Sequence, residues 1–280
     1  GQVVLMPMSI SVEAYGVRLV IGVVMAFLAG LVIIGGIQRI GAVASRLVPA
    51  MVLIYSVCVI SILFIHADQI LGALSLVFQE AFQPRAIAGG TLLALIIEGG
   101  KRASFSNEAG IGTAPMMHGA AKTNEPVREG LVAMMGPAID TLVVCTMTGL
   151  CILVTGLWKV GGSDGIALTA QAFEQSLGTM GSIGLVVSVL IFGFTTIFGM
   201  AFYGRQCFEF LAGTKYTHLF HYWYVLIIVV GAVVSLEVVV NVIFIGFGLM
   251  AIPTVTSAIL LSPKVMQASK RYFSSLKNSK

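Results

Sequence analysis

The chain has 280 residues, of which 58% are hydrophobic and 10% are charged, and its formal net charge is +4. Soluble domains carry roughly 25% charged residues, so this composition excludes a soluble protein and indicates a polytopic membrane protein. The cations gather in short loops between apolar spans, which argues against nucleic-acid binding. The chain opens on a loop-like segment without an initiator Met or a cleavable leader, so we expect a fragment of a longer protein.

Hydropathy predicts seven membrane crossings, since a helix needs about 20 apolar residues to span the hydrocarbon core. The third crossing is interrupted in its middle. The sixth is short, with a re-entrant hairpin as the alternative, and it is parted from the seventh only by Glu237 and Asn241. In chain order the predicted crossings are 17–37, 48–65, 86–121, 131–157, 182–203, 222–236 and 241–261.

The distribution of Lys and Arg predicts the orientation of these crossings. Most of the Lys and Arg residues lie in 38–47, 122–129, 204–221 and the C-terminal segment 262–280. Cytoplasmic segments of membrane proteins carry such an excess of Lys and Arg. We therefore expect a multi-pass protein of the cell membrane with a cytoplasmic C-terminus. The basic segment 262–280 is interpreted as a solvated tail that sets the topology, with attraction to an anionic inner leaflet as the alternative.

Two segments on the predicted outer side have helical patterns. In 67–85, apolar residues recur at helical spacing against polar ones, which predicts an amphipathic surface helix. Such a helix is either a connector lying on the protein or an external lid over a pathway. In 159–180, a short helix is expected at 166–177.

The segment 98–130, EGGKRASFSNEAGIGTAPMMHGAAKTNEPVREG, directs the functional interpretation. It follows an apolar run, 86–97, that is too short for a full crossing, and it turns polar at membrane depth. Irregular backbone is tolerated in a membrane only where protein buries it or where it lines a cavity. An interrupted hydrophobic segment therefore indicates the binding site of a secondary transporter, with a cytoplasmic loop as the alternative.

The glycines and the threonine of this segment favour binding of an anionic group. Gly110 and Gly112 allow a positive φ and a close approach of the backbone to a ligand. Thr113 is predicted to cap a new half-helix with Pro115 in its first turn. The free N–H groups at that helix start would face a carboxylate of the substrate.

Oxygen donors precede the glycines. The carbonyls around 105–109, including that of Phe105, stand beside the Ser106 hydroxyl and the Asn107 amide, and together they suit an amino group or an alkali cation. Glu108 is an ionisable residue at membrane depth, which indicates either a functional role or a structural one at the break. Lys101 and Arg102 either pair with nearby carboxylates or extend to an interface.

Polar residues in two other spans are further candidates. Asp140 is interpreted as a structural hydrogen-bond acceptor, with a cation or proton site as the alternative. Thr195 and Thr196 are suited to a sodium site completed by carbonyl groups, although threonine hydroxyls more often bond to their own helix. Thr196 and Met200 share one helical stripe.

Nothing in the chain resembles a catalytic constellation, so we expect no enzymatic activity. The cysteines lack metal-ligand spacing and are interpreted as small buried residues, and the histidines also lack such spacing. These residues are Cys58, Cys145, Cys151, Cys207, His66, His118, His218 and His221.

Several motifs together resemble the alanine or glycine:cation symporter family, the sodium:alanine symporters. The block FSNEAGIGTAP at 105–115 is highly specific to that family. The resemblance extends over nearly the whole chain through LVIIGGIQRIGAVASRLVPAM, NEPVREGLV, IDTLVVCT, FTTIFGMAFYG and GLMAIP.

The resemblance implies an all-α, leucine-transporter-type inverted-repeat fold, of which this chain would hold about seven helices, core helices four to ten. It would form one transmembrane domain over 1–280, with the end of the first repeat at 1–66, the second repeat at 86–261 and the tail at 262–280. The broken segment would be core helix six, and Thr195 and Thr196 would lie on core helix eight, which helps to form a sodium site in such folds.

The sequence departs from the family pattern in two places. The family usually reads TTILGWSYYGE where this chain reads TTIFGMAFYGR (195–205), so Met200 replaces a pocket tryptophan. Methionine is slimmer and more flexible, which favours a larger side-chain pocket and a substrate bulkier than alanine. Near the C-terminus, WNLADIFNGLMAIPN becomes VNVIFIGFGLMAIPT (240–254), which puts any role of core helix ten in doubt.

We therefore expect a sodium-coupled symporter of a small neutral amino acid that works by alternating access, with the lipid bilayer as its surroundings. The alternative is a transport-inactive fragment or a membrane sensor or partner subunit that keeps the fold. The predicted sodium ligands are Thr195 and Thr196, and Glu108 and Asp140 are structural or gating candidates. The predicted substrate-binding residues are Phe105, Ser106, Asn107, Gly110, Gly112, Thr113, Thr196 and Met200.

Overall fold

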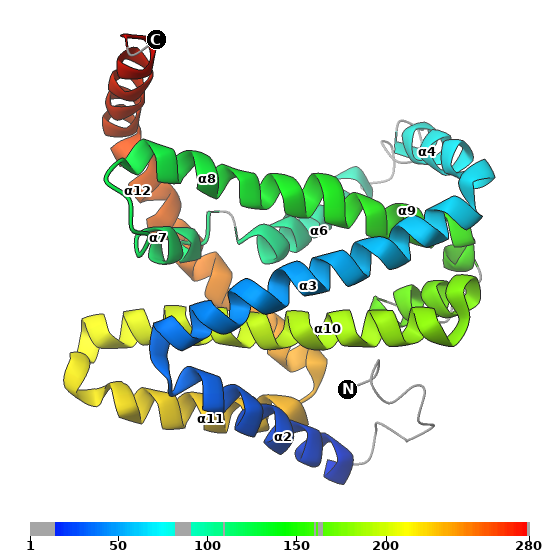
Figure 1. Ribbon diagram of the computed structural model, residues 1–280, viewed down its shortest axis with the longest axis horizontal. Helices are drawn as coiled ribbons and strands as arrows, with labels where there is room; N and C mark the ends of the chain where they lie inside the picture. The colour runs from blue at the N-terminus through cyan, green and yellow to red at the C-terminus, as the bar shows by residue number, and fades with distance from the viewer. Residues whose placement is uncertain (1–14, 82–90, 109, 160, 162–164, 279–280) are drawn as a thin grey trace. The chain divides into compact units, whose positions relative to one another are not determined.

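The computed structural model describes residues 15–81, 91–108, 110–159, 161 and 165–278, and the regular elements within them are helical (Figure 1). Six helical stretches among these residues are long and apolar enough to cross a membrane, which confirms a polytopic helical protein. They are Tyr15–Ile33, Gly36–Ile65, Pro126–Thr155, Ile166–Ala212, Thr214–Val233 and Leu236–Asn278.

The remaining predicted crossing, 86–121, is the interrupted one. It contains α6 (Thr91–Asn107) and the short α7 (Thr113–His118), which are separated by irregular backbone. Part of the apolar run that precedes it, up to residue 90, lies outside the described residues.

Two segments that were predicted to be cytoplasmic loops are helical. Residues 38–47 lie inside α3 (Gly36–Ile65), because the chain reverses earlier, at Gly36, which has a φ of 74°. Residues 204–212 belong to the end of α10 (Ile166–Ala212), which stops at Gly213 with a φ of 81°. These predictions were wrong because hydropathy marks the apolar part of a helix, whereas its end depends on the capping geometry.

The end of the chain is also more helical than expected. The sixth crossing is one continuous helix, α11 (Thr217–Val233), and not a re-entrant hairpin. The 3₁₀ turn η4 (Thr214–Tyr216) precedes it. The boundary to α12 (Leu236–Asn278) falls at residues 234–235, ahead of the predicted boundary at Glu237 and Asn241. Residues 262–278 of the basic segment continue α12 as a helix.

Both helices expected on the outer side are present. The amphipathic segment forms α4 (Ala67–Ala81). Its residues Ile70 and Ala73 join the core beside α3, while Leu71 and Phe78 are exposed. The predicted short helix at 166–177 is the first part of α10, and it ends at a kink where Gly178 has a φ of 62°.

The chain divides into two compact units. The first comprises residues 1–83 and 145–235, and it contains α2 (Tyr15–Ile33), α3, α4, α9 (Thr146–Thr155), the 3₁₀ turn η3 (Leu157–Lys159), α10 and α11. The second comprises residues 84–144 and 236–280, and it contains α6, α7, α8 (Pro126–Ala138), most of the π-helix η2 (Ile139–Cys145) and α12.

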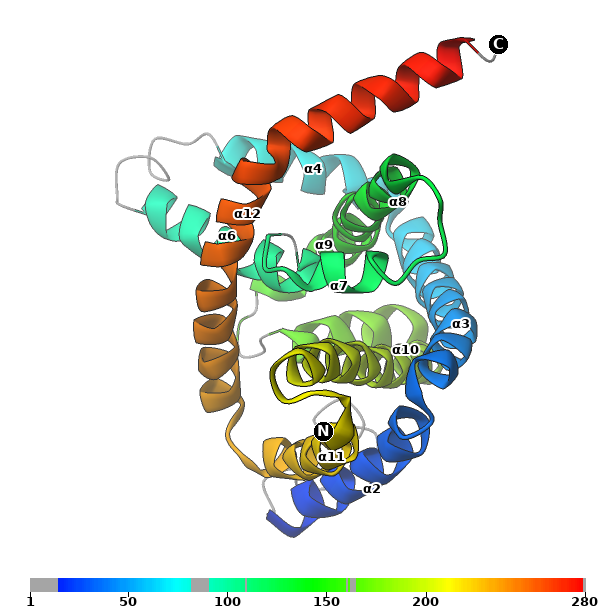
Figure 2. The same ribbon diagram turned by 90° about the vertical axis from the view of Figure 1, so that its left-hand side faces the viewer.

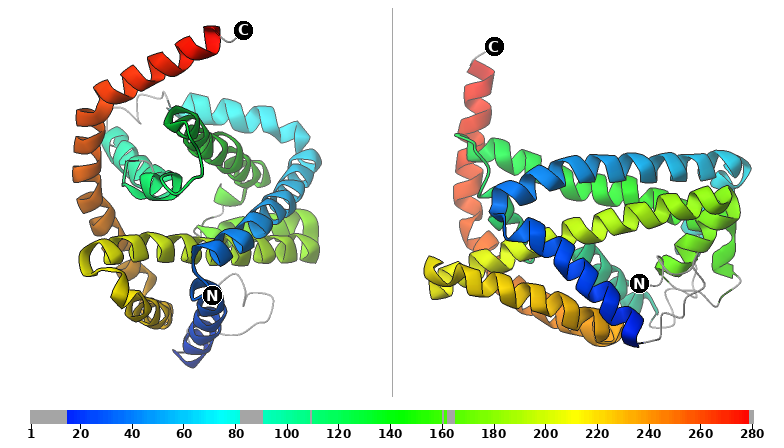
Figure 3. Two further views of the ribbon diagram at one scale, coloured as in Figure 1. Left: turned by 60° about the vertical axis from the view of Figure 1, so that its left-hand side comes forward. Right: turned by 60° about the horizontal axis from the view of Figure 1, so that its bottom comes forward.

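In the first unit, α3 packs along α10 and α2 packs along α11 (Figures 1 and 3). Small residues allow these helices to approach closely: a Cβ on Gly22 of α2 would lie 2.7 Å from Cβ of Ala232 on α11. A Cβ on Gly184 of α10 would lie 2.7 Å from Sγ of Cys58 on α3. Such contacts are typical of helix packing inside membranes, where close backbone approach supplies the van der Waals attraction.

Two apolar clusters form the core of this unit. One joins α3, α9 and α10 through Val59, Cys151 and Phe173, all fully buried. The other joins α2, α3 and α10 through Ala29, Ile40 and Phe198. The cysteines are free thiols, but the prediction that all are buried was wrong, because Cys145 and Cys207 are exposed.

Candidate functional site

The break between α6 and α7 is formed by residues with left-handed backbone conformations. Glu108 directly after α6 has a φ of 52°, and Gly110 and Gly112 have φ values of 81° and 96°. The amide of Ile111 donates a hydrogen bond to the carbonyl of Glu108, 3.4 Å away, which closes a tight turn. The sequence prediction of an unwound segment between two half-helices is confirmed over these residues, while Ala109 lies outside the described residues.

The helix after the break differs from the prediction. Gly112 and not Thr113 occupies the N-cap position of α7, and no side chain caps the helix. Thr113 is the first helical residue, and its hydroxyl caps no backbone amide. Because α7 has only six residues, its dipole is small, and the predicted attraction of a carboxylate to its N-terminus is correspondingly weak.

The last residues of α6 are bonded to the π-helix η2. The hydroxyl of Ser106 donates a hydrogen bond to Oδ2 of Asp140, 2.5 Å away. The amide nitrogen of Asn107 donates to Oγ1 of Thr141 at 2.9 Å, and Oγ1 of Thr141 donates back to Oδ1 of Asn107 at 3.0 Å. Two predicted binding residues, Ser106 and Asn107, therefore meet the predicted intramembrane carboxylate, Asp140.

The π-helix was not predicted. Pro137 lies two residues before it and lacks the N–H that would continue the α-helical hydrogen-bond ladder, and its ring crowds the preceding turn. The wider turn of a π-helix inserts an extra residue and turns Asp140 and Thr141 toward α6, and such bulges are frequent at functional sites. The signal in the sequence was Pro137 followed closely by two polar residues in an apolar span.

Gly112 lies tightly against α12. A Cβ at this position would lie 2.7 Å from Oγ1 of Thr254, whose hydroxyl donates to the carbonyl of Met250 on its own helix. Together with the φ of 96°, this contact leaves glycine as the residue that fits here. Thr254, which the sequence did not single out, therefore leaves no room for a side chain at this point of the break.

Thr113 carries an unusual hydroxyl. The residue is 2% exposed, and its Oγ1 has no hydrogen-bond partner in the part of the chain that the structure describes. A buried hydroxyl without a partner costs about 1–3 kcal/mol, so such a group usually bonds to a water, an ion or a ligand. Hydroxyl and carbonyl oxygens are also the donors that hard cations prefer.

The other end of α7 is fixed by a side-chain hydrogen bond to α8. Nδ1 of His118 lies 2.7 Å from Oε1 of Glu129 on α8. The start of α8 is capped by Glu125, which accepts a hydrogen bond from the amide of Val127, with Pro126 in the first turn. The motif NEPVREG is therefore a helix start that holds α7 in place.

The predicted sodium ligands lie in the first unit, on α10. The hydroxyl of Thr195 lies 3.0 Å from the carbonyls of Ile191 and Phe192 and donates to its own helix, as threonine hydroxyls in membrane helices commonly do. A hydroxyl that donates in this way still has a lone pair for a cation. Thr196 is exposed and Met200 is half-buried.

The predicted site residues are thus divided between the two units. The second unit brings together Ser106, Asn107 and Asp140 and holds Glu108, Gly110, Gly112 and Thr113 at the break. The first unit contains Thr195, Thr196 and Met200 on α10. Phe105 lies in the last turn of α6.

Long apolar helices, with an unwound segment held by bonded polar side chains, define a polytopic membrane protein. The model of the sodium:alanine symporter family matches residues 4–280, and the chain belongs to this family. The resemblance drawn from the sequence motifs is confirmed.

Several curated proteins are similar to the chain. A sodium/alanine symporter, AgcS, of Methanococcus maripaludis is 38% identical over 93% of this chain and 58% of its own length. An uncharacterized transporter of Haemophilus influenzae is 38% identical over 92% of this chain and 58% of its own length. A probable sodium/glutamine symporter, GlnT, of Bacillus subtilis is 34% identical over 93% and 55%, so the chain spans little more than half the length of these relatives.

Proposed function

We propose that this protein couples the movement of sodium to the uptake of a small neutral amino acid, by alternating access around the break between α6 and α7. The observation that carries the proposal is the arrangement at 106–113, where two bonded polar pairs hold the end of α6 beside unwound backbone and a buried, unpartnered hydroxyl. A rigid polar support beside free hydrogen-bonding groups is what a zwitterionic solute requires inside a membrane.

Each polar group at the break has a distinct role in this proposal. Asn107 and Ser106 are held by Thr141 and Asp140, so that the carbonyls at the end of α6 keep one orientation for the amino group of the substrate. The Thr113 hydroxyl and the amides of the turn bind its carboxylate. Asp140 accepts the Ser106 hydroxyl and acts as a structural or gating residue.

Sodium is the second transported solute. Thr195 and Thr196 of α10 are its proposed ligands, because a threonine hydroxyl that donates to its own helix still offers an oxygen lone pair. The family is described as sodium:alanine symporters and the relative AgcS is named a sodium/alanine symporter, which supports sodium as the coupling ion.

The substrate class follows from Met200. This residue is half-buried on α10 and stands where the family pattern has tryptophan, so the proposed pocket for the substrate side chain is wider. One relative is named as a glutamine carrier and another as an alanine carrier. We therefore include glutamine-sized neutral amino acids among the proposed substrates.

The test is uptake of labelled alanine, glycine and glutamine into proteoliposomes, with sodium or with potassium outside. We expect uptake of at least one of them with sodium only, and a loss of about tenfold in Asn107→Ala, equivalent to ~1.4 kcal/mol of binding. The control is Thr256→Val on α12, which removes an exposed hydroxyl bonded only to its own helix. Uptake that is indifferent to sodium, or unchanged in Asn107→Ala, would contradict the proposal.

The second candidate is a transport-inactive protein that senses or accompanies another membrane protein. The departures from the family pattern in 240–254 favour this second function, because Phe244 and Phe247 stand where the family has polar residues. This function predicts sodium-dependent binding of an amino acid without any accumulation in proteoliposomes. Equilibrium binding measured beside uptake on the same preparation separates the two functions.

A further inference from the structure

The last part of α12, residues 262–278, is a helix that follows the predicted crossing 241–261 directly; we call it the tail helix. Pro263 lies at the junction, where its ring crowds the carbonyl of Ile259 and loosens the helix. Figure 2 shows that the orange part of α12 and its red end run in different directions, and the left view of Figure 3 agrees. The chain thus turns away from the axis of its crossing where the apolar span ends.

The tail helix has one apolar face. At about 3.6 residues per turn, its apolar side chains fall within one arc, which also contains Ser262 and Ser269, and Gln267, Ser274 and Asn278 lie opposite. Val265, Met266 and Phe273 are more than half exposed, at 62%, 59% and 51%. The apolar members of the arc are Val265, Met266, Ala268, Tyr272, Phe273 and Leu276.

The cations of the tail helix border this apolar face on both sides. Lys264 and Arg271, seven residues apart, lie along one edge, and Lys270 and Lys277, also seven residues apart, lie along the other. No Asp or Glu follows Glu237 in the sequence. The helix therefore combines an apolar face with two rows of positive charge and no opposing charge.

This arrangement matches the depth profile of a membrane interface. A helix lying flat there places its apolar face among the acyl chains, and the stems of Lys and Arg at its edges extend outward to the phosphates. Each such cation near an anionic leaflet adds attraction, whereas a neutral leaflet offers the apolar contact alone. In water the same apolar residues would remain exposed.

We propose that the tail helix lies flat on the membrane leaflet next to it and binds the headgroups of anionic phospholipids through Lys264, Lys270, Arg271 and Lys277. The apolar arc inserts between the acyl chains, and Tyr272 beside Phe273, with ring centroids 5.4 Å apart, sits at the headgroup level. This surface is independent of the transport site. It favours the alternative of attraction to an anionic leaflet over the interpretation of 262–280 as a solvated tail.

Fluorescence of the full chain in lipid nanodiscs tests the proposal. An environment-sensitive dye is attached to Leu276→Cys on the apolar arc or to the matched control Ser274→Cys on the polar side, with the native cysteines replaced by alanine. We expect the dye at 276 to shift to shorter wavelengths in nanodiscs containing phosphatidylglycerol, and less in pure phosphatidylcholine, with no shift at 274. Equal spectra at 276 and 274, or a shift at 276 independent of the lipid, would overturn the proposal.

Replacing all four cations by glutamine should abolish the lipid dependence of the dye at 276. The matched control replaces four exposed cations elsewhere, Lys122, Arg128, Lys159 and Lys215, by glutamine, and it should keep the dependence. If both quadruple variants behave alike, overall charge and not the tail helix is responsible, and the proposal fails.

A second measurement needs no substitution. Trypsin cleaves after Lys270, Arg271 and Lys277, and mass spectrometry detects the released peptides. Cleavage should be about tenfold slower in nanodiscs with phosphatidylglycerol than in phosphatidylcholine, and high salt should restore it by screening the cations. Cleavage at one rate in both lipids, or protection that salt leaves unchanged, would contradict binding to anionic headgroups.

Discussion

Asn107 and Thr141, which are 34 residues apart in the chain, exchange two hydrogen bonds of 2.9 and 3.0 Å between the end of α6 and the π-helix η2. Ser106 makes the neighbouring bond to Asp140. The irregular segment therefore begins at a fixed point, and the backbone carbonyls that precede it have a defined direction.

Thr141→Val removes both bonds to Asn107 while keeping the shape of the side chain. We expect a loss of about 1–3 kcal/mol, since the amide of Asn107 is left without this partner, and a matching fall in uptake. The measurement is the thermal unfolding midpoint in detergent together with transport. Thr155→Val, which removes a hydroxyl bonded to the carbonyl of Ile152 on its own helix, is the control and should change little.

Gly112→Ala tests the contact between the break and α12. The added Cβ would lie 2.7 Å from Oγ1 of Thr254 in a backbone conformation with a φ of 96°, so we expect a destabilisation of about 1–3 kcal/mol. Gly130→Ala inside α8 has open space around the new Cβ and should be neutral or stabilising. Equal midpoints for the two variants would show that the contact does not constrain the break.

Glu108 allows its structural and functional roles to be separated. Glu108→Gly relieves the positive φ and should raise the stability by up to about 1 kcal/mol, whereas Glu108→Gln keeps the conformation and removes the charge. If the carboxylate takes part in transport, both variants lose uptake, whatever their unfolding midpoints. Full uptake in Glu108→Gln would restrict Glu108 to a structural role.

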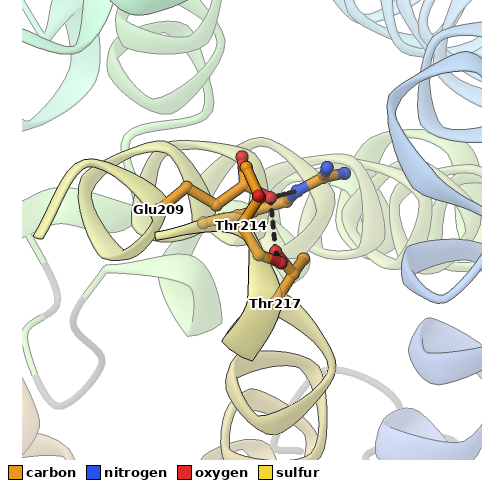
Figure 4. A network of polar contacts seen from close by, with 4 residues as sticks. Glu209, Thr214 and Thr217 are labelled. Atoms are coloured by element: carbon orange, nitrogen blue, oxygen red, sulfur yellow. Dashed lines mark hydrogen bonds and ion pairs between the residues drawn. The ribbon is translucent and has the colours of Figure 1, made fainter. Parts of the chain in front are cut away.

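A polar network fixes the turn between α10 and α11, as Figure 4 shows. Oε1 of Glu209 accepts hydrogen bonds of 2.7 Å from Nε of Arg205 and from the hydroxyl of Thr217, which also lies 2.8 Å from the carbonyl of Thr214. We expect Glu209→Ala to cost about 1–2 kcal/mol and to lower the unfolding midpoint by roughly 2–6 °C. Glu174→Ala, at an exposed position on α10, is the control, and an equal shift there would show that the network adds nothing specific.

Met200→Trp restores the residue of the family pattern. If Met200 contacts the substrate side chain, the bulkier indole should lower the uptake of glutamine relative to alanine by about tenfold, since a pocket discriminates by ~1–3 kcal/mol per methylene. Competition between unlabelled amino acids and labelled alanine measures this ratio. Met180→Trp on the same helix, where Met180 is 78% exposed, should leave the ratio unchanged.

Local sequence patterns predicted most of the helices and the position of the break. Apolar runs gave the six long helices, the helical spacing in 67–85 gave α4, and Gly110 and Gly112 indicated the positive φ values that occur there. Each of these features depends on residues that are neighbours in the chain. The loop predicted at 38–47 and the first part of the loop predicted at 204–221 are helical, because a basic residue can lie in a helix as well as in a loop.

The contacts that hold the candidate site could not be predicted from such local patterns. The bonds from Ser106 and Asn107 to Asp140 and Thr141, and the contact of Gly112 with Thr254, join residues that are far apart in the sequence. The π-helix after Pro137 depends on how its hydrogen bonds reform against the rest of the unit.

The sequence by itself determined that this protein is a helical membrane protein of the sodium:alanine symporter family with an interrupted helix at 105–113, since hydropathy, glycine positions and family motifs are properties of the chain alone. Only the tertiary structure decided which side chains hold that interruption, and that the Thr113 hydroxyl beside it is buried without a partner among the described residues. Hydrogen bonds between distant segments form only once packing has brought those segments within about 3 Å of each other.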